Sequence, residues 1–341
     1  MPKVLLIKTS SMGDLIHTMP AITDLAAARD DIELHWLVEE GFAAIPLWHP
    51  SVRKVHCCAI RRWRSSLLKR ATRDEIRALK HSLQAEQYDL VIDAQGLLKS
   101  AWMARWLPSE KHGYDRNSIR EPLASRVYDV QHAISRQQTA IERNRQLLAA
   151  ALGYALPAQR RFGLAVQRPA DLAVAIDKPY VLLLHGTNWA SKIWPLACWQ
   201  ELARRLSEAG LQVYLPWGSD EERARAGQIA SHGAGQVLPR LSLTSLAFLL
   251  QHARLVVGSD TGLSHLAAAL DTPTLGIYGS TDPALTGLVG SRVINLAATM
   301  DCAPCMKREC PKLSASEPQI PCYRTVDADR VWQALQAANW L

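Results

Sequence analysis

A carboxylate that could take part in chemistry, Asp14, lies at the end of a loop of small residues. The segment KTSSMGDLIHTMPA (8–21) follows a short apolar strand and leads into a helix, an order typical of phosphate-binding turns. The loop lacks, however, the spacing of a Walker loop or of G-x-G-x-x-G. A carboxylate repels phosphate but can accept a proton from an attacking hydroxyl, so Asp14 is a candidate general base. A plain helix N-cap is the alternative. The loop groups expected to face a ligand are Ser10, Ser11 and the Gly13 backbone.

The most specific anion-binding pattern is VVGSDTGLSHLAAAL (256–270). Between a buried strand and a helix it places Asp260, Thr261 and Gly262. Asp260 or Thr261 can cap the helix, whose first N–H groups then point outward, and Gly262 lets an anion approach the backbone. Because a helix N-terminus favours negative charge, the segment predicts a diphosphate site. An ordinary capped helix is the competing interpretation.

Two further loops follow predicted strands in the same half. The segment LLLHGTNWASKIWP offers the hydrogen-bonding residues Thr187 and Asn188 and the cation Lys192, which could neutralise a departing phosphate. The segment LPWGSDEERARA places Glu222 early in a helix, where it could accept hydrogen bonds from ribose hydroxyls. The competing interpretations are a solvated lysine and an acid that stabilises the helix dipole. Three such loops together favour nucleotide binding more strongly than any one of them.

Parallel sheets are needed to bring these loops together, and the apolar pattern predicts one in each half. Short continuous apolar runs alternate with helical periodicity, which is typical of βαβ units with helices on both faces. The predicted strands are 4–7, 33–38, 54–58, 90–93, 180–185, 212–217, 255–259 and 274–279. The predicted helices are 14–28, 74–87, 98–106, 134–152, 195–209, 220–231, 243–252, 261–270 and 328–338.

The chain of 341 residues is long enough for two domains, each with its own core. Residues 153–178 are weakly periodic, contain two prolines and leave room for one short strand. We therefore predict an N-terminal domain at 1–165, a linker at 166–178 and a C-terminal domain at 179–341, whose last helix could pack back on the first domain. Doubly wound sheets bind ligands at the carboxyl ends of their strands, so we expect the active site in a cleft between the domains.

The charge distribution limits the partners. The net charge is +7, and residues 61–80 hold eight Lys or Arg against two acids, with Trp63, Leu67 and Leu68 among them. This mixture suits an anionic lipid surface, and a solvated basic helix is the alternative. Nucleic acid is not an expected partner, because no helix-turn-helix, zinc-finger, RRM or KH signature is present. No apolar run reaches the ~18 residues of a membrane span and no signal peptide is recognised, so we expect a cytoplasmic protein.

Several motifs together resemble those of one enzyme family. They are KTSSMGDLIHTMPAITDL, WLVEEGFAAIP, AIRRWR, IDAQGLLKSA, HGYDRNSIREPLAS and VVGSDTGLSHLAAALDTPTLGIYGSTDP. The set covers most of the chain and is similar to glycosyltransferase family 9, the heptosyltransferases of lipopolysaccharide synthesis. The resemblance implies the α/β GT-B architecture, in which two Rossmann-like domains face a cleft. It also implies an inverting single displacement from ADP-L-glycero-β-D-manno-heptose (ADP-heptose), with the Kdo region of Kdo2-lipid A as acceptor.

The same resemblance implies roles for individual residues. Asp14 matches the family's catalytic base, and Lys192 matches the lysine that steadies the leaving diphosphate. The other matched donor-binding positions are Thr187, the ribose-binding acid Glu222, Asp260, Thr261, Gly262, Leu263 and His265. Two positions differ conservatively from the family pattern. Asn188 stands in place of a threonine, and Leu241 stands in place of a methionine near the adenine.

Acceptor recognition is implied for the basic first half of the chain. The matching positions are Arg61, Arg62, Arg64 and Arg120. Arginine binds carboxylate and phosphate through its bidentate fork, and the implied acceptor offers both, because Kdo carries a carboxylate and lipid A carries phosphates. The implied location is the cytoplasmic face of the inner membrane, where the protein would be bound peripherally.

The implied chemistry requires no cofactor, because Lys192 and backbone N–H groups can carry the charge of the leaving group. No D-x-D metal motif preceded by a strand is present. A separate cluster with the spacing Cys302-x2-Cys305-x4-Cys310-x11-Cys322 could bind a structural zinc ion. Reduced thiols in a loop are the alternative, and a disulfide is disfavoured in a cytosolic protein.

Three other functions compete with this interpretation. A transferase of the same family with another inner-core acceptor would keep the reaction and prefer an already heptosylated substrate. A nucleotide-binding module without catalysis needs no carboxylate in the first loop, so Asp14 counts against it. A nicotinamide dehydrogenase is disfavoured, because no G-x-G-x-x-G follows the strand at 4–7.

Overall fold

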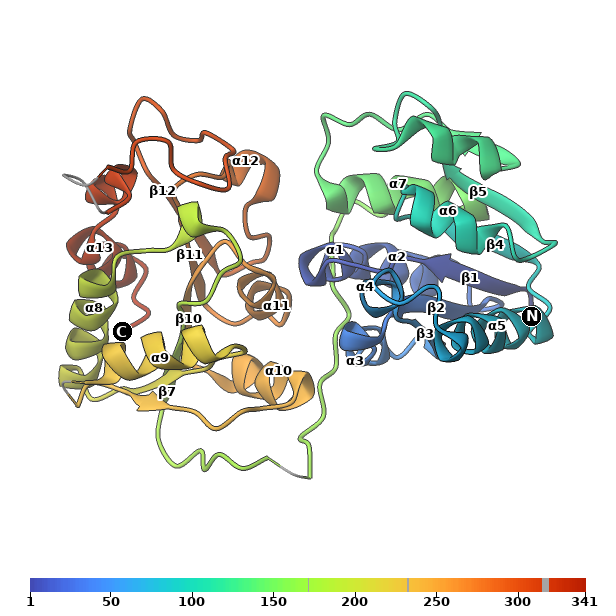
Figure 1. Ribbon diagram of the computed structural model, residues 1–341. Coiled ribbons are helices and arrows are strands. Elements are labelled where there is room, and N and C mark those ends of the chain that lie inside the picture. The colour runs from blue at the N-terminus through green and yellow to red at the C-terminus, as the bar shows by residue number, and fades with distance from the viewer. Residues whose placement is uncertain (171, 232, 315–318) are drawn as a thin grey trace. The chain divides into compact units, whose positions relative to one another are not determined.

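The structure is a computed structural model of the chain, and it describes residues 1–170, 172–231, 233–314 and 319–341. The chain forms two compact units, Met1–Ala165 and Val166–Leu341, each built on a six-stranded sheet (Figure 1). None of the described helices combines the length and the apolar character that a membrane crossing requires.

The first unit carries a parallel sheet with the strand order β3-β2-β1-β4-β5-β6. Its strands are β1 (Lys3–Ile7), β2 (Glu33–Glu39), β3 (Val52–Cys58), β4 (Leu90–Asp93), β5 (Glu110–Tyr114) and β6 (Val130–His132). Its α-helices are α1 (Met12–Ile16), α2 (Met19–Ala28), α3 (Ala44–Leu47), α4 (Ile60–Trp63), α5 (Arg70–Ala85), α6 (Leu98–Ala104) and α7 (Ala140–Leu152). Two 3₁₀ turns, η1 (Glu40–Phe42) and η2 (Pro122–Val127), complete the unit.

The second unit carries a parallel sheet with the order β12-β11-β10-β7-β8-β9. Its strands are β7 (Tyr180–Leu184), β8 (Gln212–Leu215), β9 (Gln236–Val237), β10 (Leu255–Ser259), β11 (Thr274–Tyr278) and β12 (Val293–Ala297). Its α-helices are α8 (Leu196–Glu208), α9 (Asp220–Ala230), α10 (Leu243–His252), α11 (Gly262–Ala269), α12 (Pro283–Thr286) and α13 (Ala328–Ala337). Two 3₁₀ turns are η3 (Ala190–Lys192) and η4 (Pro321–Thr325).

Both sheets share one topology. Numbered along each unit, the strands follow the order 3-2-1-4-5-6, which is the order of nucleotide-binding Rossmann sheets. The order reverses between β1 and β4 in the first unit and between β7 and β10 in the second. Loops at the carboxyl ends of these strands border the crevice in which such sheets bind ligands. Asp14 follows β1, Lys192 follows β7 and Asp260 follows β10, so the topology places all three at these crevices.

The core of the second unit follows from the strand pleat, which sends alternate side chains to opposite faces. Residues that alternate along four strands lie in one buried cluster with α8, α9 and α13, namely Val181, Leu183, Val213, Leu215, Leu255, Val257, Leu275 and Ile277. Figure 1 shows α8 and α13 together on one side of this sheet and α10 and α11 on the other. Helix α13 packs against α8, through the buried residues Val331 and Leu335, so the last helix belongs to the core of the second unit.

The first unit buries an ion pair between two helices. In its core, α5 and α6 pack on one face of the sheet, while α2 and α7 contact each other. Between α2 and α7, Arg145 Nε lies 2.6 Å from Asp24 Oδ2, and both side chains are almost completely buried. Arg145 also donates to the carbonyl oxygen of Pro157, which ties the chain after α7 to the same pair.

The structure differs from the sequence-based prediction at several elements. The predicted helix 14–28 is two helices, because Pro20 cannot donate an N–H bond and clashes with the preceding turn. The helix predicted to begin at residue 134 begins at Ala140, where Thr139 is the N-cap and accepts from the Glu142 N–H. Four strands were not predicted, β5, β6, β9 and β12, and none of the described residues of 153–178 forms a strand.

Candidate active site

An ion pair lies at the switch point of the second sheet. Lys192, in η3, projects toward the end of β10, where its Nζ lies 2.7 Å from Asp260 Oδ2 and 3.2 Å from the Asp260 carbonyl oxygen. The two side chains come from loops 68 residues apart in sequence, and both are largely buried. Lys192 is thus held in place by Asp260, and it is not a solvated loop lysine.

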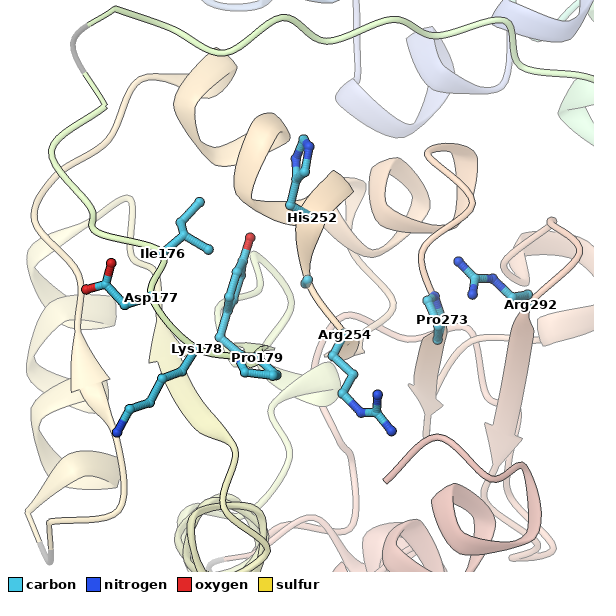
Figure 2. Close-up of a pocket in the computed structure, with 10 residues that line it drawn as sticks. Ile176, Asp177, Lys178, Pro179, His252, Arg254, Pro273 and Arg292 are labelled. Carbon is cyan, nitrogen blue, oxygen red and sulfur yellow. The ribbon is translucent and has the colours of Figure 1, made fainter.

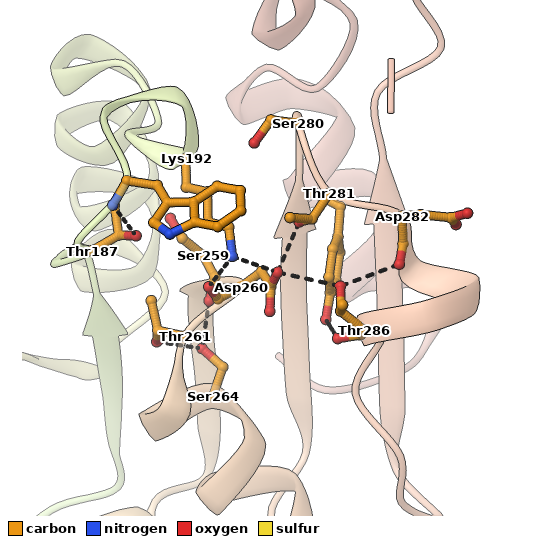
Figure 3. Close-up of polar contacts among 12 residues, drawn as sticks. Thr187, Lys192, Ser259, Asp260, Thr261, Ser264, Ser280, Thr281, Asp282 and Thr286 are labelled. Carbon is orange, nitrogen blue, oxygen red and sulfur yellow. Dashed lines mark hydrogen bonds and ion pairs between the residues drawn. The ribbon is translucent and has the colours of Figure 1, made fainter. Parts of the chain in front are cut away.

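Asp260 is surrounded by donors from its own unit. Figure 3 shows Lys192, Thr281 and Thr286 converging on its carboxylate, with Thr281 Oγ1 at 2.7 Å and Thr286 Oγ1 at 3.3 Å from Oδ2. His265 Nε2 lies 3.2 Å from Oδ1. Burial raises the pKa of Asp260, but the hydrogen bond to His265 and the charge of Lys192 outweigh it and hold the pKa well below its usual range. Asp260 is therefore an anion that positions Lys192, and its own carboxylate does not suit direct phosphate binding.

Next to this pair, helix α11 presents its N-terminus. Thr261 is the N-cap, but its side chain makes no capping hydrogen bond to the first turn, and its hydroxyl lies 3.3 Å from Ser264 Oγ. The Ser264 hydroxyl instead donates to the carbonyl oxygen of Ser259. The first amides of α11, which begin at Gly262 and Leu263, therefore offer donors to an anion beside the Lys192 ammonium group. Both predicted features of this segment, the strand end and the helix start, are present.

Loop 185–193 carries aromatic support for the lysine. The Lys192 ammonium lies 4.6 Å from the centre of the Trp189 ring, and the Arg308 guanidinium lies 5.5 Å from the same ring. The backbone N–H of Trp189 donates to Thr187 Oγ1 at 3.4 Å. Asn188 is exposed. Trp189 was not singled out in the sequence, although it lies between Asn188 and Lys192 in the quoted segment.

Glu222 lies against the same loop. It stands at the third position of α9, where Ser219 is the N-cap, and its Oε2 accepts from the Gly218 N–H at 2.7 Å. A Cβ on Gly186 would overlap the Glu222 carboxylate, so this acid packs over the loop that follows β7. Glu222 is therefore a helix-terminal acid that also lies against the loop after β7, and its binding of ribose hydroxyls stays a prediction. Leu241 is half-buried immediately before the Ser242 N-cap of α10.

In the first unit, Asp14 belongs to a capping box. Its Oδ2 accepts from both the N–H and the hydroxyl of Ser11, at 2.7 and 2.8 Å, and the side chain is half-buried. Ser11 is the N-cap of α1, whereas Gly13 and Asp14 lie within this helix. Burial raises the pKa of Asp14, but the charge of Lys8 and the Ser11 hydrogen bonds more than offset it, so the pKa lies below its usual range. Asp14 is therefore ionised at neutral pH, as a proton acceptor must be.

Two side chains that the sequence did not single out organise this loop. Lys8 is buried and donates to the carbonyl oxygen of Ala94, and burial lowers its pKa although the charge of Asp14 opposes that shift. Gln95, which follows β4, accepts from the N–H groups of Thr9 and Ser10 through Oε1. The loops after β1 and β4 are thus joined at the switch point of the first sheet.

The four arginines expected to bind the acceptor are all exposed, but they are not equivalent. Arg62 is paired with Glu40 and Glu75, at 3.1 and 2.9 Å. Arg61 places its guanidinium 5.2 Å from the centre of the Phe42 ring. Arg64 ends α4, and Arg120 precedes η2. Arg62 is therefore engaged by acids of its own unit, while the other three present their charge to solvent.

A cavity of about 530 Å³ lies at the opposite end of the second sheet (Figure 2). It is lined by Tyr180, which begins β7, and by Arg254 and Pro273, which precede β10 and β11. These are the amino ends of the strands, whereas sheets of this class bind ligands at the carboxyl ends. The cavity is therefore distinct from the candidate active site.

Fold and site together define a class of protein. Two sheets of Rossmann order, with a lysine and a helix N-terminus at one switch point and an ionised acid at the other, correspond to nucleotide-sugar glycosyltransferases of the GT-B architecture. A family model described as glycosyltransferase family 9 (heptosyltransferase) matches residues 76–315. The chain belongs to this family.

Relatives and solved structures agree with this assignment. Lipopolysaccharide heptosyltransferase 1 of Pseudomonas aeruginosa is 48% identical, with 98% of this chain and 97% of that protein covered. The same enzyme of Escherichia coli is 46% identical over 84% of this chain and 91% of its own. The structure of E. coli heptosyltransferase WaaC with ADP is similar at a TM-score of 0.86 and 40% identity, covering 98% of this chain and 99% of that one.

Proposed function

We propose that this glycosyltransferase moves L-glycero-D-manno-heptose from ADP-heptose to the Kdo region of Kdo2-lipid A during lipopolysaccharide inner-core synthesis. The similarity to heptosyltransferase 1 from two organisms supports the acceptor class. The donor is supported by a structure of E. coli WaaC with ADP-2-deoxy-2-fluoro heptose, which is 39% identical, with a TM-score of 0.82 and coverage of 98% of this chain and 99% of that one.

The observation that carries the proposal is the Lys192–Asp260 pair beside the N-terminus of α11. In the proposed reaction, the donor diphosphate binds the first amides of α11, and Lys192 neutralises the charge that develops as the diphosphate leaves. Glu222 and Thr187 bind the ribose side of the donor, and Leu241 lies near the adenine. The positive charge of Lys192 and of the α11 N-terminus supports transfer without a metal cofactor.

Asp14 acts as the general base in this proposal. Its carboxylate takes the proton of the acceptor hydroxyl as that hydroxyl attacks the anomeric carbon from the face opposite the diphosphate, which inverts the anomeric centre. The Ser11 hydrogen bonds hold the carboxylate ionised and fix its orientation. Ser10 and the loop backbone line the approach of the acceptor.

Acceptor docking is assigned to the basic surface of the first unit. Arg61, Arg64 and Arg120 are exposed cations suited to the carboxylate of Kdo and the phosphates of lipid A. Leu67 and Leu68 follow Arg64 closely in the sequence and are 53% and 93% exposed. Cations interspersed with exposed leucines favour peripheral binding at an anionic membrane surface, which here is the cytoplasmic face of the inner membrane.

The direct test is a product assay with ADP-heptose and Kdo2-lipid A, read by mass spectrometry and linkage analysis. We expect one heptose added to Kdo. A matched reaction uses an acceptor that already carries one heptose. Transfer to that second acceptor alone would favour the alternative, a heptosyltransferase II or another family-9 enzyme with a different inner-core acceptor. Release of ADP without any sugar acceptor would contradict both.

A further inference from the structure

Four cysteines in the second unit line a single small cavity. Cys302, Cys305 and Cys310 come from the chain after β12, and Cys322 comes from η4. The cavity has a volume of about 90 Å³, and none of the four cysteines forms a disulfide. Residues distant in sequence therefore converge, since Cys322 follows Cys302 by 20 positions. Four thiols around one cavity form the ligand set that tetrahedral metal sites use.

The surroundings of the cavity suit an anionic metal–thiolate centre. Lys307 and Lys312 belong to its lining. One divalent ion with four thiolates carries a net charge of −2, which these two cations would balance.

The segment that carries three of these cysteines also braces the Lys192 loop. Ser191 donates its N–H to the Arg308 carbonyl oxygen at 3.0 Å and its hydroxyl to the Lys307 carbonyl oxygen at 2.6 Å. Tyr323, next to Cys322, donates its hydroxyl to the Ser191 carbonyl oxygen at 3.3 Å. The residue before Lys192 is therefore hydrogen-bonded to chain on both sides of the cysteine cavity.

A second cluster offers metal ligands, but its contacts argue against a cation. Of the described histidines, cysteines and acids, His35, His56 and Glu86 are the group whose ligand atoms all lie within 4.8 Å of one another. Glu86 already pairs with Lys3 and Lys54, and the Tyr88 hydroxyl lies within 3.0 Å of both histidines. These contacts satisfy the cluster without a metal, so it does not carry the inference.

We propose that Cys302, Cys305, Cys310 and Cys322 bind one zinc ion, which fixes the segment that braces Ser191 and so positions Lys192 for the donor. Binding replaces four S–H protons by four zinc–sulfur bonds and releases the protons to solvent. Zinc–sulfur bonds of about 2.3 Å would draw the four sulfur atoms around one ion. The metal is structural and lies outside the transfer reaction itself.

The test begins with metal content. The full-length protein is purified under reducing conditions without metal-affinity resin, and its metals are measured by inductively coupled plasma mass spectrometry. We expect one zinc per chain, falling at least five-fold in Cys302→Ser and Cys310→Ser. The matched control is Cys57→Ser, which changes an exposed thiol on β3 and should keep the full zinc content. Circular dichroism confirms that each variant is folded.

A second measurement tests the link to the donor, and this arm alone rests on the proposed function. ADP binding is measured by calorimetry before and after zinc is removed with a chelator, and we expect the Kd to rise several-fold and to recover when zinc is added back. Less than 0.1 equivalent of any metal, or two disulfides in the purified protein, would overturn the site. One equivalent of iron would overturn the choice of zinc. Zinc removal with an unchanged Kd for ADP would overturn the role in positioning Lys192.

Discussion

At the scale of single residues, the two carboxylates Asp14 and Asp260 have different hydrogen-bond surroundings. Asp14 accepts two hydrogen bonds from Ser11 on Oδ2, which orient the carboxylate and keep it ionised. Asp260 receives Lys192, Thr281 and Thr286 on one oxygen and contacts His265 through the other. The first arrangement suits proton transfer, and the second suits the fixing of a cation.

The Asp14 assignment predicts a pH effect. The pKa of Asp14 is lowered, so the base form is present above that pKa and activity is lost only as the pH falls through it. Ser11→Ala removes one hydrogen bond that lowers the pKa of Asp14, and we expect the acid limb of kcat/KM to move to higher pH.

Asp14→Asn removes the proposed base and should reduce kcat roughly 10²–10⁴-fold. The control is Asp30→Asn, an exposed acid of the same unit. Near-normal turnover of folded Asp14→Asn would show that another group is the base.

The Lys192–Asp260 pair predicts non-additive losses. Lys192→Ala should lower kcat/KM roughly 10²–10³-fold, the range for removing one preorganised group that stabilises developing negative charge. The loss in kcat/KM for Asp260→Asn should be about 10-fold smaller than for Lys192→Ala, because the lysine remains but has lost the carboxylate that holds it in place. The double variant should resemble Lys192→Ala, since Asp260 acts through the lysine. Losses that simply multiply in this cycle would mean that Asp260 contributes independently.

At the scale of elements, the strand-end loops are positioned by the helices that pack behind them. Thr18 and Asn144 join α7 to the chain between α1 and α2, because Asn144 Nδ2 donates to Thr18 Oγ1 at 3.0 Å and Thr18 Oγ1 donates to the Asp14 carbonyl oxygen. The buried Asp24–Arg145 pair fixes the same two-helix layer. The orientation of α1, and with it the position of Asp14, therefore depends on the packing of α2 against α7.

This packing predicts a stability effect. Asp24→Ala removes the fully buried carboxylate that pairs with Arg145 and leaves the guanidinium only the weaker contact with Glu142 at 3.3 Å and the Pro157 carbonyl oxygen. We expect the free energy of unfolding of the first unit to fall by up to about 3–5 kcal/mol. Urea denaturation followed by circular dichroism measures it. The control is Asp74→Ala, which breaks exposed pairs with Arg70 and Arg77 in the same unit and should cost less than about 1 kcal/mol. Equal costs for the two variants would show that Arg145 gains solvent or another partner when Asp24 is removed.

At the scale of the whole molecule, charge and apolar exposure are concentrated in one segment. The net charge is +7, and residues 61–80 contribute eight cations. Leu68 lies among them and, at 93%, is the most exposed large apolar side chain in the part of the chain that the structure describes. The surface pairs of Arg62 and Arg77 with neighbouring acids neutralise part of this charge. The remainder is available to an anionic surface within a Debye length of about 8 Å at physiological salt.

The segment predicts salt-dependent membrane binding. Vesicles that contain anionic lipid should co-sediment with the protein, and neutral vesicles should not. We expect Leu68→Glu to reduce binding at least five-fold, because it removes an inserting side chain and adds a repelled charge. Leu156→Glu, at a partly exposed leucine before the second unit, is the matched control and should bind normally. Binding that is unaffected by Leu68→Glu or by 0.5 M salt, a concentration well above physiological ionic strength, would assign membrane contact to another surface.

Much of the fold could be predicted because the central strands are continuous apolar runs. VLLI, LVID and LVVGS are buried along almost their whole length, and apolar runs of this kind are typical of strands in parallel sheets. The four strands that were not predicted are polar, very short or only half-buried, as in EKHGY of β5 and QV of β9. Their pairing with a neighbouring strand stabilises them, and a single-sequence pattern does not contain that information.

The sequence by itself determined the two alternating halves, the strand ends that carry Asp14, Lys192 and Asp260, and the family motifs. Only the tertiary structure decided what each of these side chains contacts. Thr281 and Thr286 contact Asp260 although they lie more than 20 residues away in sequence, Lys192 contacts it from 68 residues away, and the four cysteines line one cavity. The reason is physical: local patterns fix which residues lie at strand ends, whereas hydrogen bonds and ion pairs between loops depend on the order of strands in the sheet.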